Sequence, residues 1–97
     1  MNTVYFNFKK IENNADFYAQ LGDKLQLPDY FGNNLDALYD ILTGYVELPL
    51  MFYFNNLTEE KLACFANLIA TLNDAEESTK GQFSFDYNFG AQDWVNK

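Results

Sequence analysis

Asp36 and Asp40 stand four residues apart in the stretch "YFGNNLDALYDILTGY", residues 30 to 45. Side chains at this spacing are neighbours on a helix, and two like charges there cost about 0.2–0.5 kcal/mol. Two such carboxylates could hydrolyse a glycosidic bond or supply oxygen ligands to Mg²⁺. The stretch contains no lysine or arginine, so the acidic pair lacks a local counter-charge.

The rest of the sequence disfavours an enzyme. The absence of histidine excludes serine- and cysteine-hydrolase triads of the usual kind and the common zinc sites. The five glycines are scattered and form no phosphate-binding loop. A small domain with its acids on a convex helix face offers little room for a sugar-binding cleft. We therefore expect no catalytic residue, no metal and no cofactor, and we keep an acid-pair hydrolase only as a remote alternative.

The acidic pair belongs to a face that is better suited to binding. At about 100° per residue, one side of the predicted helix collects Leu35, Leu38, Ile41 and Leu42. The opposite side collects Asp36, Tyr39, Asp40 and Thr43, and the flanking turns add Tyr30 and Tyr45. Tyrosine is enriched in binding hot spots because it offers a large, rigid contact area. Aromatic side chains around concentrated charge favour a recognition face, although Tyr30 and Tyr45 could instead pack at the edge of the core.

The overall charge points to the kind of partner. The chain of 97 residues has 14 acidic residues against 6 lysines and no arginine, which gives a net charge of −8. Nucleic acids and acidic membrane surfaces both require cations, so this balance argues against either as a partner. No basic residue occurs between Lys24 and Lys61, and six acidic residues fall in that window. The acidity predicts a basic protein partner, with simple solubility as the other interpretation.

The elements that must position this face follow from hydrophobic patterning. Residues 3–8, 48–56 and 82–89 are rich in aromatic and β-branched residues and predict strands. Helices are predicted for residues 13–25, from Asn33 or Asn34 to about Thr43 with Gly44 just beyond the end, and from Thr58 to about residue 80. For that long last helix we expect an inward stripe of Leu62, Phe65, Ile69 and Leu72.

Strands separated by helices imply parallel pairing and an α/β fold. We expect one domain over residues 1–97, with a core at about 2–89 and a short tail at 90–97 in which Trp94 has no predicted place.

Two further expectations concern the compartment. No secretory signal or membrane-spanning run is present, and a cytoplasmic location is expected. Cys64 is the single cysteine and lies in the apolar pattern "KLACFANLI". This pattern predicts a buried, inert thiol in preference to a reactive one.

The stretch "LPDYFGNNLDALYDILTGYVELPL" resembles the barstar family, small intracellular inhibitors of guanyl-specific ribonucleases of the barnase type. The family pattern is Leu-Pro-acidic-aromatic-aromatic-Gly-x-Asn-Leu-Asp-Ala-Leu-aromatic-Asp, then Leu-Thr-Gly-aromatic and a proline before a strand. The match runs from Leu27 through Pro49, while the flanks agree in pattern alone. The resemblance implies a barstar-like α/β fold, a three-stranded parallel sheet packed with three to four helices.

The resemblance also implies a mechanism. In the family, the second helix and the turn before it block the active site of the nuclease, and the acid at the position of Asp40 takes the place of the substrate phosphate. The partner-binding residues that the resemblance implies are Tyr30, Gly32, Asn34, Asp36, Tyr39, Asp40, Thr43, Gly44, Tyr45 and Asp74. The protein would be a monomer when free and would bind neither nucleic acid nor membrane.

The chain departs from the family at several positions. Tyr39 and Tyr45 occupy positions where the best-known member has tryptophan, and Ile41 replaces a cysteine. The family also uses an acid late in the third helix, where Asp74 is our first choice and Glu76 and Glu77 are alternatives. These departures leave open a different basic toxin or another protein as the partner, with the chain as its immunity or interaction protein.

Overall fold

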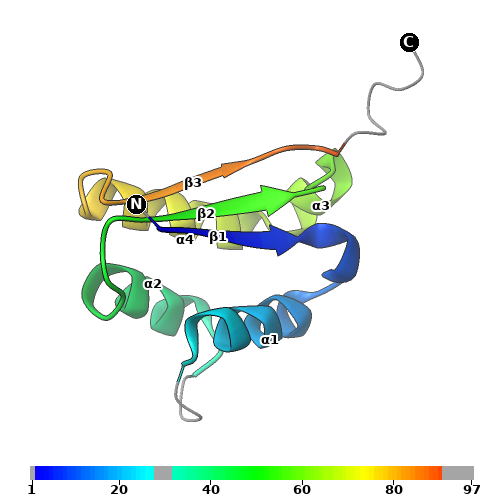
Figure 1. Ribbon diagram of the computed structural model, residues 1–97. Coiled ribbons are helices and arrows are strands. Elements are labelled where there is room, and N and C mark those ends of the chain that lie inside the picture. Colours follow the sequence, from blue (N-terminus) through cyan, green and yellow to red (C-terminus); the bar gives the residue numbers. More distant parts are fainter. Residues whose placement is uncertain (1, 28–31, 91–97) are drawn as a thin grey trace.

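The sheet is the framework of the molecule. The computed structural model describes residues 2–27 and 32–90. Three parallel strands, β1 (Asn2–Asn7), β2 (Leu50–Asn55) and β3 (Phe83–Tyr87), lie in the order β1-β2-β3 (Figure 1). Helices connect each strand to the next, as parallel neighbours require. The predicted parallel α/β fold is confirmed.

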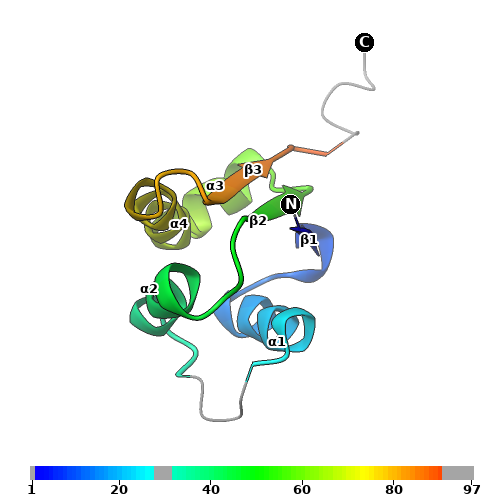
Figure 2. The ribbon, with the colours of Figure 1, turned by 60° about the vertical axis from the view of Figure 1, so that its left-hand side comes forward.

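The helices form a second layer. They are η1 (Phe8–Lys10), α1 (Asn14–Leu25), α2 (Leu35–Gly44), α3 (Glu59–Cys64) and α4 (Ala66–Ser78). Figure 2 shows α1, α2 and α4 gathered on one face of the sheet. The other face carries no helix in the described part of the chain, so the fold has two layers.

The burial pattern follows this arrangement. Phe6, Phe52, Phe54 and Phe83 point to the helix layer and are fully buried. Their rings pack closely, with centroids 5.0 Å apart for Phe6 and Phe52 and 5.1 Å apart for Phe52 and Phe83. Alternate residues point to the open face, where Tyr5 lies opposite Tyr53 in register and is 58% exposed. No polar or charged residue in the described ranges is buried.

The prediction of one long helix after Thr58 is wrong in one respect, because the helix is broken at Phe65. The Phe65 backbone adopts φ −105° and ψ 26°, which ends α3 and begins α4. The break lets the Phe65 ring enter the core, 4% exposed and edge-on to Phe8 with centroids 5.3 Å apart. The inward stripe of α4 consequently runs through Leu68, Leu72 and Ala75, whereas Leu62 and Ile69 are only half-buried.

The same break corrects the prediction for Cys64. Its thiol is exposed, because Cys64 is the last residue of α3 and the inward position at the break belongs to Phe65. The prediction for Trp94 and the tail lies outside the described residues beyond Gly90. Within the described ranges, no helix combines the length and hydropathy needed to cross a membrane.

Candidate functional site

The start of α2 is built by Gly32 and Asn34. The Asn34 Oδ1 accepts a hydrogen bond of 2.8 Å from the backbone N–H of Ala37, which is the expected helix cap. The Asn34 Nδ2 donates to the carbonyl of Gly32 at 3.1 Å, and a Cβ on Gly32 would lie only 2.9 Å from that nitrogen. A Cβ at Gly32 would therefore require the Asn34 amide, which caps α2, to shift. Tyr30, also assigned to the site, lies outside the described residues.

The two sides of α2 separate largely as the helical spacing predicts, but Leu35 is only half-buried, and Tyr39, predicted on the opposite side, packs against the core. Leu38, Ile41 and Leu42 are buried in the core. Asp36 and Asp40 are exposed on the other side. Among the described residues, the single salt bridge joins Lys61 Nζ to Glu12 Oε2 at 3.6 Å, so it uses neither aspartate.

The two aspartates have different surroundings. Asp36 lies in the first turn of α2, where the helix dipole stabilises a negative charge. Asp40 lies beyond that turn, and its carboxylate has no hydrogen-bond or ion-pair partner in the described part of the chain. Asp40 is therefore a negative charge that nothing in the described structure compensates.

Tyr39 and Thr43 are held by the fold. Tyr39 is half-buried against the core, and its hydroxyl shares a hydrogen bond with the hydroxyl of Ser78 at the end of α4. The Thr43 Oγ1 donates to the carbonyl of Tyr39 at 2.8 Å. No pattern in the sequence singles out Ser78, because a serine at a helix end gives no signal of a contact with residue 39.

Gly44 and Tyr45 form the C-terminal end of α2. Gly44 is the last residue of α2 and not the left-handed residue after it, which corrects the predicted helix end. A Cβ at Gly44 would meet nothing within 4 Å. Tyr45 is 59% exposed, and its backbone N–H caps the helix by donating to the carbonyl of Ile41 at 3.0 Å. Both residues are exposed, and Gly44 lies one turn after Asp40.

The predicted acid Asp74 lies on α4, the helix next to α2. Helix α4 packs beside α2 (Figures 1 and 2). Asp74 is exposed on α4 and stands one turn before Ser78. Glu76 is half-buried and Glu77 is exposed. The structure thus brings together the α2 residues and the end of α4.

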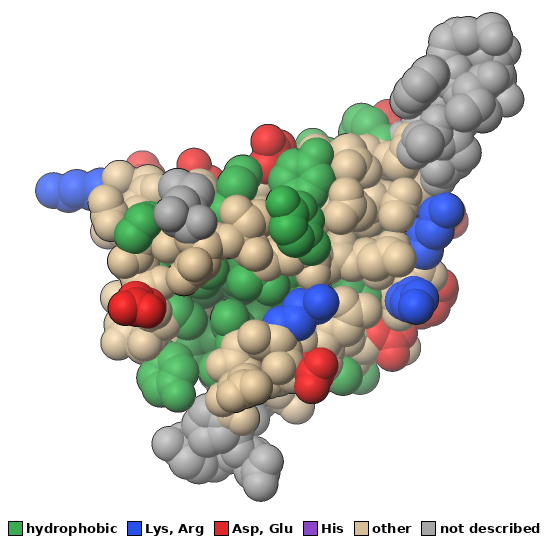
Figure 3. Space-filling view, viewed as in Figure 1, with side chains coloured by type: hydrophobic (Ala, Val, Ile, Leu, Met, Phe, Trp, Pro, Cys, Tyr) green, Lys and Arg blue, Asp and Glu red, His purple; other side chains and the backbone are tan. Residues whose placement is uncertain are grey.

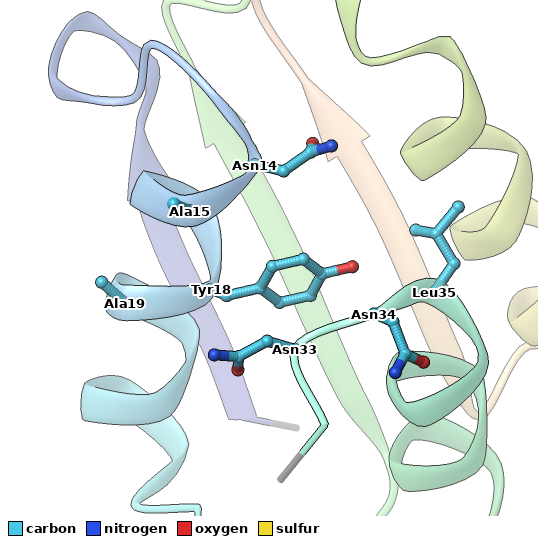
Figure 4. A pocket seen from close by; sticks show the side chains of 7 residues that line it. All are labelled: Asn14, Ala15, Tyr18, Ala19, Asn33, Asn34 and Leu35. Atoms are coloured by element: carbon cyan, nitrogen blue, oxygen red, sulfur yellow. The ribbon is translucent and has the colours of Figure 1, made fainter.

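Two cavities that described residues line border this region, and neither has Asp36 or Asp40 in its wall. One of about 490 Å³ lies between the beginnings of α1 and α2, where the Tyr18 hydroxyl points between the helices and Asn14 and Asn33 flank it (Figure 4). Burial raises the pKa of the Tyr18 hydroxyl above its usual value. The other cavity, of about 580 Å³, has Tyr45 in its wall.

Figure 3 shows apolar side chains gathered in a hollow between the sheet edge and the helix layer. Within the described residues, no three acidic or cysteine side chains converge as metal ligands would. Asp36 and Asp40 are exposed on α2 and line neither of these two cavities.

Comparison with known proteins agrees with the sequence pattern. The family model described as "Barstar (barnase inhibitor)" matches residues 1–91. One relative is the Bacillus subtilis (strain 168) protein named "Putative ribonuclease inhibitor YrdF". It is 36% identical over 86 residues, which cover 86% of this chain and 94% of the relative.

Proposed function

The chain belongs to the barstar (barnase inhibitor) family, and from that premise we propose that it inhibits a basic, guanyl-specific ribonuclease of the barnase type. It acts in the cytoplasm of the cell that makes the nuclease and has no catalysis of its own. Helix α2 and the turn before it enter the nuclease active site and exclude RNA.

The observation that carries the proposal is the state of Asp40. Its carboxylate is exposed on α2 and has no partner within the described structure. A ribonuclease active site collects cationic side chains to hold the phosphates of RNA. In our proposal, Asp40 takes the place of one phosphate there, and charge-assisted hydrogen bonds from the enzyme hold its two oxygens.

The surrounding residues provide the rest of the contact surface. Asp36 adds a second negative charge one turn earlier on the same side of α2. Thr43, Gly44 and Tyr45 form the end of this surface, where the exposed Tyr45 ring offers an aromatic anchor. Tyr30, which precedes α2 in the sequence, and Asp74 on α4 complete the proposed set.

The acidic face also explains why the free protein tolerates a repulsive pair. The Asp36–Asp40 repulsion costs about 0.2–0.5 kcal/mol on an exposed helix. Binding of arginine and lysine side chains removes that cost and adds favourable contacts. Nuclease binding thus recovers the small loss of stability.

The experiment is a titration of RNA cleavage. A guanyl-specific ribonuclease of the barnase type is mixed with increasing amounts of the protein at low salt, and cleavage of an RNA substrate is followed. We expect cleavage to fall to zero at one inhibitor per enzyme. Full cleavage in the presence of a molar excess of the folded protein would contradict the proposal.

A second candidate is an immunity protein for a different basic toxin or protein partner. Tyr39 favours it, because its hydroxyl is used within the chain and the family's best-known member has tryptophan at this position. The same titration separates the two candidates when a basic toxin that is not a guanyl-specific ribonuclease is tested beside the ribonuclease. Inhibition of that toxin alone would select the second candidate.

A further inference from the structure

The contact between Tyr39 and Ser78 is unlike the rest of the packing between α2 and α4. It is the one hydrogen bond between side chains of these helices in the described structure. Leu38 and Leu42 of α2 and Leu72 of α4 belong to the same apolar core. Apolar contacts are non-directional, whereas a hydrogen bond requires a particular distance and angle.

The hydrogen bond lies among the acidic residues of the proposed binding surface. Asp36 precedes Tyr39 by three residues and Asp40 follows it directly, while Asp74 precedes Ser78 by four. Residues three or four apart lie on the same helix face. The Tyr39–Ser78 bond therefore joins the two helices next to the acids that each of them carries.

We propose that Ser78 is a positioning residue that, by holding the Tyr39 hydroxyl, fixes the acidic side of α2 relative to Asp74 on α4. This inference rests on the proposed function and names a further residue on which the binding depends. A partner with cationic groups for both helices then meets one fixed arrangement of charges. Fixing that arrangement before binding lowers the entropic cost of association.

Thr43 reinforces this arrangement from the α2 side. Its Oγ1 donates to the carbonyl of Tyr39, so the backbone of Tyr39 is also held by a side chain one turn later. The Tyr39 ring is half-buried against the core. Because few rotatable bonds join the ring to the backbone, its position is closely tied to that of α2. Loss of the Ser78 hydroxyl should consequently loosen the contact between the helices without unfolding either helix.

The test compares Ser78→Ala, Tyr39→Phe and the double variant with the wild type by their Kd for a catalytically inactive barnase-type ribonuclease. Far-ultraviolet circular dichroism confirms that each variant is folded at the binding temperature. We expect each single change to raise Kd about three- to tenfold, the usual worth of one hydrogen bond. The double variant should lose no more than either single variant, because both changes remove the same bond.

Two controls separate positioning from general effects. Ser78→Thr keeps a hydroxyl and should bind within about twofold of the wild type. Tyr53→Phe removes a phenol hydroxyl that accepts a 3.3 Å hydrogen bond from Asn88 Nδ2 on the open face of the sheet. This variant should leave Kd unchanged.

Each outcome has a separate meaning. Unchanged Kd in folded Ser78→Ala and Tyr39→Phe, with a lower free energy of unfolding alone, would reduce the bond to a structural contact and overturn the inference. Losses that add in the double variant would overturn it as well. Absence of binding by the wild type would instead overturn the proposed function, and the inference with it.

Discussion

Asp36 and Asp40 look equivalent in the sequence, but they differ in the structure. Asp36 lies in the first turn of α2, where its negative charge interacts favourably with the positive end of the helix dipole. Asp40 lacks this interaction, and an uncharged side chain in its place would relieve the repulsion with Asp36. Of these two aspartates, Asp40 is therefore the one whose charge the fold does not stabilise.

Burial of Tyr18 predicts how the stability of the free protein changes with pH, and no nuclease is needed to test it. Burial raises the pKa of its hydroxyl in the folded protein, so the unfolded chain, with a pKa of about 10, loses the proton first. The stabilising contribution of Tyr18 is complete below pH 10 or so and decreases as the pH rises through the folded-state pKa. Tyr18→Phe cannot lose this proton.

Urea unfolding of wild type and Tyr18→Phe at about pH 8 and about pH 11 provides the measurement. We expect the wild type to lose more free energy of unfolding than the variant over this interval. An equal loss in both proteins would show that Tyr18 does not titrate differently in the folded state.

Among the elements, the end of α2 shows a conflict between stability and binding. Gly44 is helical, and a Cβ there would meet nothing within 4 Å. Gly44→Ala should therefore raise the free energy of unfolding, by up to about 1 kcal/mol. The same methyl group would stand between α2 and a closely bound partner, so Kd for the nuclease should rise.

Gly22→Ala is the matched control for Gly44→Ala. Gly22 lies within α1, and a Cβ there also has nothing within 4 Å. We expect this variant to gain similar stability and to bind as the wild type does. If the two variants bind equally well, Gly44 is not part of the contact surface.

The break between α3 and α4 allows a sharper test of the fold. Phe65→Ala removes a ring that is 4% exposed and should cost about 3–5 kcal/mol of unfolding free energy. Cys64→Ala, at the neighbouring exposed position, should change it by less than about 0.5 kcal/mol. Denaturant unfolding measures both, and similar losses would contradict the position of the break.

The strands and the first two helices could be predicted because local signals mark them. Asn13 and Asn34 cap α1 and α2, and the run of apolar and aromatic residues around Phe52 and Phe54 marks β2. The break at Phe65 has no local signal, since neither glycine nor proline is present there. It arises from the fit of one ring against Phe8, a contact between residues far apart in the sequence.

The candidate site shows the same division. Helical spacing was sufficient to place Asp36 and Asp40 on the exposed side of α2. It could not show that the Tyr39 hydroxyl reaches Ser78, because that contact depends on how α4 packs beside α2. Local patterns determine which face a side chain occupies, and tertiary packing determines which distant residue it meets.

For the whole molecule, the unequal distribution of charge predicts a strong effect of salt on association. The net charge is −8, and no lysine interrupts residues 25–60. Strongly steered complexes associate at about 10⁸–10⁹ M⁻¹s⁻¹ against about 10⁵–10⁶ without steering, a range to which a complex of this family itself contributed. Screening sets in over a Debye length of about 10 Å at 0.1 M salt.

Stopped-flow mixing with a barnase-type ribonuclease at increasing salt tests this prediction. We expect the association rate constant to fall at least about tenfold between low and high salt, with a smaller change in dissociation. An association rate that does not depend on salt would exclude electrostatic steering by the acidic face.

The most direct measurement compares Kd for a barnase-type ribonuclease among wild type, Asp40→Asn and Asp86→Asn. Both variants change the net charge by one, but Asp86 is exposed on β3 at the open face of the sheet, where its Oδ1 accepts from the N–H of Tyr87. If Asp40 replaces a substrate phosphate, Asp40→Asn should cost about 2–5 kcal/mol, about thirtyfold or more in Kd, while Asp86→Asn stays within about twofold of the wild type. Equal Kd values for the two variants would contradict the claim that α2 occupies the active site with Asp40.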